Sequence, residues 1–139
     1  MGPLARSALR LTPPERRVAL EAAALLPLAA LAVRFCPPAR AARVMDASCS
    51  TAAGELAPRR IAAIADAVLT LAHARCLTKT LILKRMLSRR GVQTEAVVGV
   101  ARDESQLAAH AWLEWNGEVL IGAGSREYAP LWRSGAARP

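Results

Sequence analysis

The hydrophobic positions of this chain repeat first with a helical period and later with a strand period. Near the N-terminus, Thr12 is followed by "PPERRVALEAAALL", which carries Glu15. A hydroxyl cap, prolines that tolerate the first turn, and a Glu three residues after the cap are typical of a helix start. We expect a helix over Pro14–Phe35 that bends near Pro27, and a short helix over Ala39–Met45.

Two further helices are predicted in the middle of the chain. Arg59–Ala74 carries apolar residues close to the 3.6-residue period of an amphipathic helix. Leu77–Arg90 does the same, and "SRRG" ends it with cations and with the glycine Gly91. The small, polar segment Asp46–Leu56 lacks a period and is predicted to be a loop.

After Gly91 the pattern becomes that of a small sheet. Strands are predicted over Thr94–Ala101, Ala108–Trp115 and Glu118–Gly122. The last two are joined by Asn116-Gly117, a strong hairpin signal. Helices followed by an antiparallel sheet predict an α+β fold, which we divide into an N-terminal helical region, residues 1–57, and a core, residues 58–139.

Length and composition agree with an ordinary globular chain. The 139 residues are 53% apolar, enough for a hydrophobic core. Lys and Arg exceed Asp and Glu by 19 − 11 = 8 charges, so an acidic partner is expected. The arginines are not interleaved with aromatic rings, so we do not expect nucleic-acid binding.

Cysteine content and the apolar N-terminal stretch bear on location. Three cysteines are an odd number, and the chain has no cleavable-looking signal sequence, which favours a reducing, cytoplasmic compartment. The most apolar stretch, Ala22–Val33, is about twelve residues long against the roughly 20 needed to span a bilayer. We expect it to pack on the rest of the chain, with a helix lying on the membrane surface as the alternative.

Cys76 begins the predicted helix Leu77–Arg90. A thiol in the first turn of a helix meets unpaired N–H groups and the positive end of the helix dipole, and both favour a thiolate. The alternative is a buried structural cysteine, the commoner role of free cysteine. Cys36 and Cys49 have no such position and are expected to be inert.

His110 is the candidate partner of Cys76. It lies in "AHAWLEW", in a strand expected to turn its inner face toward the helix. An imidazole there could take the thiol proton and return it to a leaving amine. His73, in "HARC", is the competing partner and would suggest metal ligation, but no zinc-type spacing exists with the distant Cys36 and Cys49. We interpret His73 as a helix-end residue and expect no metal and no cofactor.

The stretch "CLTKTLILKRMLSRRGVQTEAVVGVARDESQLAAHAWLEWNGEVLIG" joins a cysteine that opens a Leu-rich helix to an Arg-Arg-Gly end, the block "AHAWLE" and a hairpin. It resembles the transglutaminase-like leader peptidases of lasso-peptide biosynthesis, the microcin-processing type, from Cys76 to about Leu131. The resemblance implies that residues 58–139 form a transglutaminase/papain-like cysteine peptidase core, with the nucleophile helix packed on a small antiparallel sheet. It also implies that Cys76 is the nucleophile and His110 its base.

The same resemblance implies a reaction and its partners. The chain would remove the leader from a ribosomally made precursor peptide, after recognition of that leader by a separate small protein. An ATP-dependent macrolactam cyclase would then close the ring on the freed amine. The alternative from another class is a non-catalytic basic adaptor of the same fold that binds an acidic peptide or a membrane surface.

One position departs from the family's pattern. Family members commonly carry an Asp twelve positions after the histidine, where this chain has Gly122. A loop Trp115–Gly117 with a glycine bulge would pair Glu114 with Glu118, and hence His110 with position 122. The third catalytic role then falls to a carboxylate such as Glu127, to a backbone carbonyl, or to water, unless the protein is an inactive relative.

Overall fold

The structure is a computed structural model that describes residues 10–45, 56–122 and 128–134. Its helices are α2 (Pro13–Phe35), α3 (Pro38–Val44), α4 (Pro58–Leu71) and α5 (Cys76–Arg89). Its strands are β1 (Glu95–Asp103), β2 (Gln106–Trp115), β3 (Glu118–Ile121) and β4 (Ala129–Arg133). This element order confirms the predicted α+β fold.

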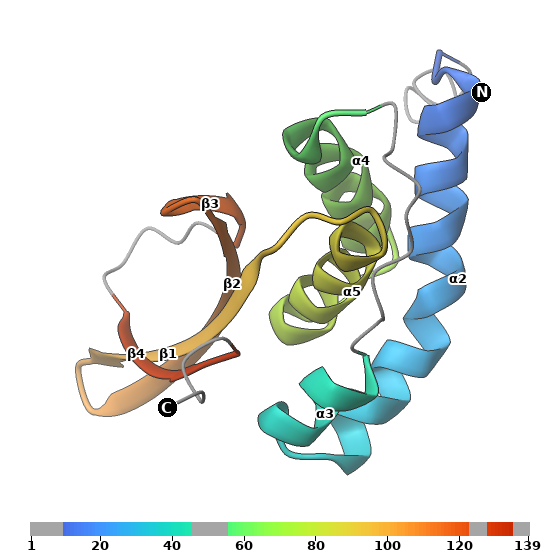
Figure 1. Ribbon diagram of the computed structural model, residues 1–139. Coiled ribbons are helices and arrows are strands. Elements are labelled where there is room, and N and C mark those ends of the chain that lie inside the picture. Colours follow the sequence, from blue (N-terminus) through green and yellow to red (C-terminus); the bar gives the residue numbers. More distant parts are fainter. Residues whose placement is uncertain (1–9, 46–55, 123–127, 135–139) are drawn as a thin grey trace.

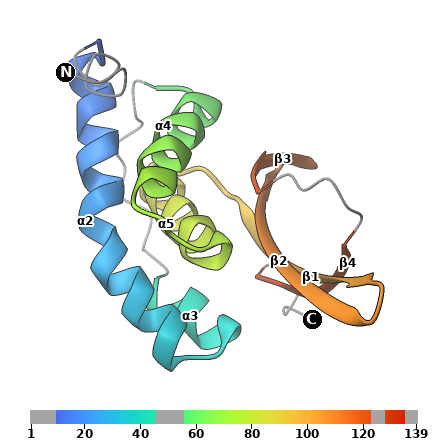
Figure 2. The same ribbon diagram turned by 180° about the vertical axis from the view of Figure 1, so that it is seen from behind.

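The helices lie together on one side of the molecule and the sheet on the other. Figures 1 and 2 show α4 and α5 between the long helix α2 and the sheet. The sheet is strongly curved, and its convex side faces the helices. In both views the N-terminal end of α5 is the end that points toward the sheet.

Helix α2 begins as its sequence predicts. The Thr12 N–H donates to Glu15 Oε2 at 2.9 Å, which is the backbone half of a capping box. Arg60 Nε, on α4, donates to Glu15 Oε1 at 2.7 Å and so ties the start of α2 to α4. Pro27 lies within the helix, and Figure 1 shows the helix changing direction partway along. The predicted bent helix is therefore confirmed.

The length of α2 corrects one expectation. The helix has 23 residues and contains an 18-residue window of mean hydropathy 1.8, of which 22% is buried inside the protein. By length and composition alone it is long and apolar enough to cross a membrane. The apolar segment is therefore longer than the twelve residues Ala22–Val33, because apolar residues on either side of that stretch belong to the same helix.

The sheet is antiparallel, with strand order β3-β2-β1-β4. Asn116 and Gly117 have φ of 51° and 79° and form a two-residue turn that pairs Trp115 with Glu118. The predicted bulge is thus misplaced. The register instead shifts farther along the hairpin, between Leu113 and Glu114 on β2, because both turn residues already supply the positive φ that a tight hairpin needs.

Strand β4 was not predicted. It pairs with β1 at the opposite edge from β3, with its own register shift between Val98 and Gly99. The short run "APLWR" has a proline at its second position and no clean alternation, and Pro130 is tolerated because β4 is an edge strand.

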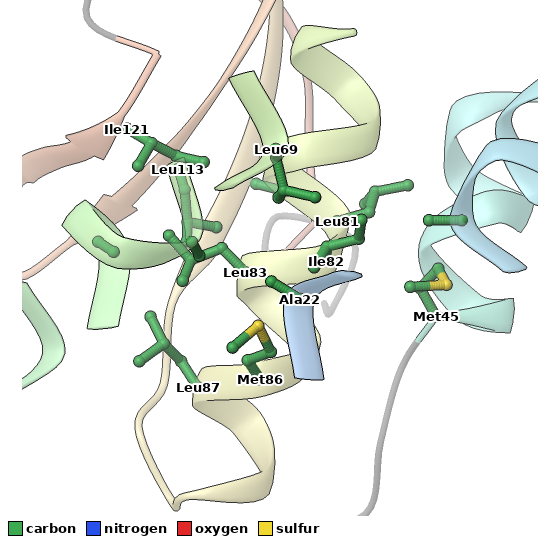
Figure 3. Close-up of a cluster of buried hydrophobic side chains, with 14 of the residues drawn as sticks. Ala22, Met45, Leu69, Leu81, Ile82, Leu83, Met86, Leu87, Leu113 and Ile121 are labelled. Atoms are coloured by element: carbon green, nitrogen blue, oxygen red, sulfur yellow. The ribbon is translucent and has the colours of Figure 1, made fainter. Parts of the chain in front are cut away.

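One hydrophobic core joins the helices to the convex face of the sheet. Figure 3 shows Leu83 of α5 beside Leu113 of β2, with Leu69 and Ile121 near them and Met86 next to Ala22. The cluster contains Ala22 and Met45 from the N-terminal helical region as well as residues of α4, α5 and the sheet. Side chains from residues 1–57 and from residues 58–139 are therefore buried against each other.

Candidate functional site

Cys76 is the first residue of α5. The helix starts one residue earlier than predicted, so the thiol lies on its first turn. Arg75 is the N-cap, its side chain caps no N–H group, and the first turn contains no acidic residue. The Cys76 carbonyl accepts from Thr80 Oγ1 at 2.8 Å. The first backbone N–H groups of α5 therefore have neither an intrahelical acceptor nor a cap from Arg75, and such groups are the donors that an oxyanion requires.

A lysine near the start of α5 links this helix to α4. Lys79 Nζ lies 3.1 Å from Asp66 Oδ1 and 2.7 Å from Thr70 Oγ1, which joins α5 to α4. Cys76 is a half-buried free thiol. Along a helix, residues at i, i+4, i+7 and i+11 share one face, and for Cys76 these are Thr80, Leu83 and Leu87, all buried. Cys76 therefore belongs to the stripe of α5 that includes Leu83, beside Leu113 in Figure 3.

His110 is held by the backbone of Gly122. Its Nε2 lies 2.5 Å from the Gly122 carbonyl oxygen. A carbonyl oxygen only accepts, so Nε2 carries the hydrogen and Nδ1 is the acceptor in the neutral ring. Of the alternatives for the third group, this contact is a backbone carbonyl, supplied by the residue that stands where the family commonly has Asp. Glu127 lies outside the described residues.

The alternation of side chains along β2 decides which way His110 points. Paired residues share a face, and Leu113, paired with Ala96, belongs to the core cluster with the helices. His110, paired with Gly99, lies three residues from Leu113 and therefore on the opposite, concave face. The expectation that His110 lies on the face turned toward the helix is wrong, because Ala111 and Leu113 occupy that face.

The contacts of His110 lie on the concave face. Within the described ranges, no hydrogen bond joins Cys76 Sγ to His110, whose ring neighbours are Trp112 and Tyr128 at centroid distances of 6.2 and 5.1 Å. Helix α5 packs against β2, and its first turn lies at the end of the helix that points toward the sheet.

A polar network continues from His110 along the concave face. Trp112 Nε1 donates to Glu114 Oε1 at 2.9 Å, and Arg133 Nη1 lies 3.0 Å from Glu114 Oε2 and 3.2 Å from Glu95 Oε2. The Trp112 hydrogen bond, and then Arg133, lower the pKa of Glu114 below its usual value. Glu114 in turn raises the pKa of Arg133. This face therefore holds an ion pair that a Trp112 hydrogen bond links to the ring cluster of His110.

Part of this network could have been found in the sequence. Trp112 and Glu114 follow His110 at intervals of two in a predicted strand, which places all three on one face. Tyr128 and Arg133 could not, because the strand that carries Arg133 was not recognised and their approach to His110 depends on the curvature of the sheet.

The backbone conformation at position 122 also favours glycine. Its φ is +84°, and a Cβ at this position would lie 2.7 Å from the Ala111 carbonyl oxygen. An aspartate therefore fits poorly here, both because L side chains rarely adopt this φ and because the nearest atom is backbone. The idea that an Asp at position 122 would orient the imidazole is not compatible with this local geometry.

His73 lies in the turn between α4 and α5. It has a φ of 56°, is exposed, and its N–H donates to the Thr70 carbonyl at 3.0 Å. This is the helix-end position that the sequence predicts. In residues 10–45, 56–122 and 128–134 there is no group of three or more His, Cys, Asp or Glu side chains that could hold a metal ion.

The comparisons with known proteins give one result at the level of the superfamily. No match was found among curated proteins or among solved structures. The profile of the Transglutaminase-like superfamily matches residues 8–133, which include every described helix and strand. That superfamily includes cysteine peptidases. The chain therefore belongs to the transglutaminase-like superfamily.

Proposed function

We propose that the protein is a cysteine peptidase that removes the leader from a ribosomally made precursor, a lasso peptide, with Cys76 as nucleophile and His110 as base. The observation that carries the proposal is the hydrogen bond that His110 Nε2 donates to the Gly122 carbonyl oxygen. This bond leaves Nδ1 free to accept a proton, and His110 lies on β2, the strand against which α5 packs. Membership of the transglutaminase-like superfamily and the position of Cys76 at the start of α5 support it.

The proposed reaction proceeds through an acyl-enzyme. His110 Nδ1 takes the Cys76 thiol proton as sulfur attacks the carbonyl at the leader–core junction, and N–H groups of the first turn of α5 stabilise the oxyanion. The imidazolium returns the proton to the departing amine of the core peptide. Water, deprotonated by the same imidazole, then hydrolyses the leader thioester, which regenerates the thiol and releases the leader carboxylate.

The proposal requires the scissile bond of the precursor to be held between the Cys76 thiol and the His110 imidazole. The leader-recognition protein would hold the precursor in that position. Positioning of reacting groups contributes a large part of such a rate. The isolated chain should therefore cleave slowly, and the recognition partner should accelerate cleavage.

The test measures cleavage of the short precursor encoded near this gene, in the presence of the leader-recognition protein, by mass spectrometry. Cys76→Ala and His110→Gln should each lower kcat by at least about 10⁴-fold. Cys36→Ala and His73→Gln are matched controls, since they remove the same groups elsewhere, and should retain activity. A Cys76→Ala variant that still cleaves would refute the nucleophile.

Iodoacetamide labelling gives a second readout that needs no substrate. Cys76 should react before Cys36, which packs against the core at the end of α2. Equal labelling of the two in the folded protein would remove the argument for an activated thiol. If no short precursor gene lies nearby while Cys76 is the faster thiol, the leader-peptidase assignment fails and a cysteine hydrolase of another substrate remains.

A second candidate function is a non-catalytic adaptor that binds an acidic peptide. It is favoured by the net charge of +8 and by the lack, among the described residues, of a hydrogen bond between Cys76 Sγ and His110. Its expected result is binding of the precursor by wild type and by Cys76→Ala with equal affinity, without cleavage by either.

A further inference from the structure

The outward side of α2 carries a continuous apolar stripe. At 100° per residue, positions 20, 24, 27, 28, 31 and 35 lie within one sector of the helix, opposite the buried residues Val18, Ala22 and Ala29. The large members of this stripe are well exposed, with Leu20 at 70%, Leu28 at 44%, Leu31 at 56% and Phe35 at 74%. Scattered exposed leucines are ordinary, but an aligned stripe on one helix is the pattern of an interaction surface.

The acidic residues of α2 are paired with arginines of the neighbouring helices. Glu15 lies on the buried side of α2 and accepts from Arg60 of α4. Glu21 lies at the border of the stripe, about 20° around the helix from Leu28, and pairs with Arg90 at the end of α5, 2.6 Å between Oε2 and Nη2. Both negative charges are therefore compensated within the protein, which limits their repulsion of an anionic surface.

Arginines lie at both ends of the stripe. Arg16 and Arg17 are exposed on the first turns of α2, and Arg34 is exposed on its last turn, with its guanidinium 5.7 Å from the Phe35 ring centre. The neighbouring α3 adds the exposed Arg40 and Arg43. An apolar stripe of about 22 Å with cations at its ends matches the acyl boundary and the anionic headgroups of a bilayer.

We propose that the protein docks peripherally on anionic membranes, with the Leu20–Phe35 stripe of α2 lying in the bilayer interface and the flanking arginines on lipid phosphates. The helix lies on the membrane and does not cross it, because its opposite side is packed on α4 and α5 through Val18, Ala22 and Ala29. Spanning would require that packing to be lost. The surface is independent of Cys76 and His110.

The experiment is sedimentation of the full chain with vesicles of phosphatidylcholine, with and without phosphatidylglycerol. Wild type should bind only the anionic vesicles. Leu31→Asp/Phe35→Asp should lower the partition coefficient at least about tenfold, and Leu20→Ser several-fold. Each of Arg16→Gln and Arg17→Gln should lower it about fivefold. Leu107→Asp, at a residue of β2 that is 71% exposed, is the matched control and should bind like wild type.

Circular dichroism and thermal melting of every variant check that the fold is kept, which is expected because all these side chains are exposed. Binding that is equal for both vesicle types, or equal for Leu31→Asp/Phe35→Asp and Leu107→Asp, overturns the proposal. So does a wild-type dimer in solution that Leu31→Asp/Phe35→Asp converts to a monomer, since the stripe would then meet a second copy. Retention in the membrane pellet after carbonate extraction also overturns it, because it indicates a spanning helix.

Discussion

The two faces of the curved sheet are built from different chemistry on the same strands. The convex face presents Ala96, Ala111 and Leu113 to the helices, and these are almost completely buried. The concave face carries His110, Trp112 and Glu114, which are half-buried and joined by hydrogen bonds and ring contacts. Alternate residues of β2 therefore have different roles. Those on the convex face form the hydrophobic core, and those on the concave face include the titratable groups.

This division separates the packing of α5 from the contacts of His110. The side of β2 that approaches α5 is filled by small and aliphatic side chains, which permits close packing of the helix. The imidazole is instead fixed on the far side by Gly122. Substitutions on the convex face therefore test the packing of the core, and substitutions on the concave face test the contacts of His110 and Glu114.

The largest expected effect is on the convex face. Leu113→Ala should lower the free energy of unfolding by about 2–5 kcal/mol, because a fully buried side chain leaves a cavity between β2 and α5. Leu107→Ala is the matched control on the same face of the same strand, beyond the helices and 71% exposed, and should change it by under about 0.5 kcal/mol. Urea unfolding measures both. Equal losses would mean that this face is not the one packed on the helices.

Much of the fold could be predicted from the sequence, because the helix periods, the Thr12 start and the Asn116-Gly117 turn are local signals. The missing strand, β4, is short and interrupted by Pro130, and it is held by pairing with β1 and by packing of Trp132 on the core, so no local signal marks it. The face of His110 was predicted wrongly for a related reason. Alternation tells which residues share a face, but which face meets the helices is decided by long-range packing of Leu113 and Ala111.

The site could be predicted only as single residues. Cys76 at a helix start and His110 in a strand follow from local pattern, and both positions are as expected. The Gly122 carbonyl as partner of His110 depends on the bulge between Leu113 and Glu114, which sets where the end of β3 lies against β2. A bulge adds one residue on one strand, and the sequence alone did not fix where it falls.

The second prediction tests the role of Gly122 on the concave face by comparison with Gly117, which has a similar φ. Gly122→Ala should lower the free energy of unfolding by roughly 1–3 kcal/mol, since φ is +84° and the new Cβ meets the Ala111 carbonyl oxygen at 2.7 Å. Gly117→Ala has φ of +79° but nothing within 4 Å, and should cost only the strain of the turn, about 1 kcal/mol.

The nitrogen chemical shifts of His110 report directly on its hydrogen bond to Gly122, which a measurement of stability alone does not. Wild type should show a hydrogen-bonded Nε2–H, and Gly122→Ala should weaken or lose it, whereas Gly117→Ala should keep it. If the two variants are equally stable and both retain the His110 signal, then Gly122 does not hold the imidazole on this face.

The smallest effect concerns the ion pair between Glu114 and Arg133. In the folded protein the Trp112 hydrogen bond and Arg133 lower the pKa of Glu114, while in the unfolded chain it returns to about 4.3. The unfolded state therefore binds more protons as pH falls through this range, so the stabilisation is complete above about pH 4.3 and is lost on further acidification.

Glu114→Gln should lower the free energy of unfolding by under about 1 kcal/mol at neutral pH, because the pair is partly exposed. Below about pH 4.3 the stability of this variant should fall less steeply than that of wild type. Arg133→Gln removes the cation and should flatten the acid profile only in part, since the Trp112 hydrogen bond, the larger cause of the lowered pKa of Glu114, remains. Urea midpoints measured from neutral to acidic pH decide the matter, and parallel curves for wild type and Glu114→Gln would show that the carboxylate adds nothing to the concave face.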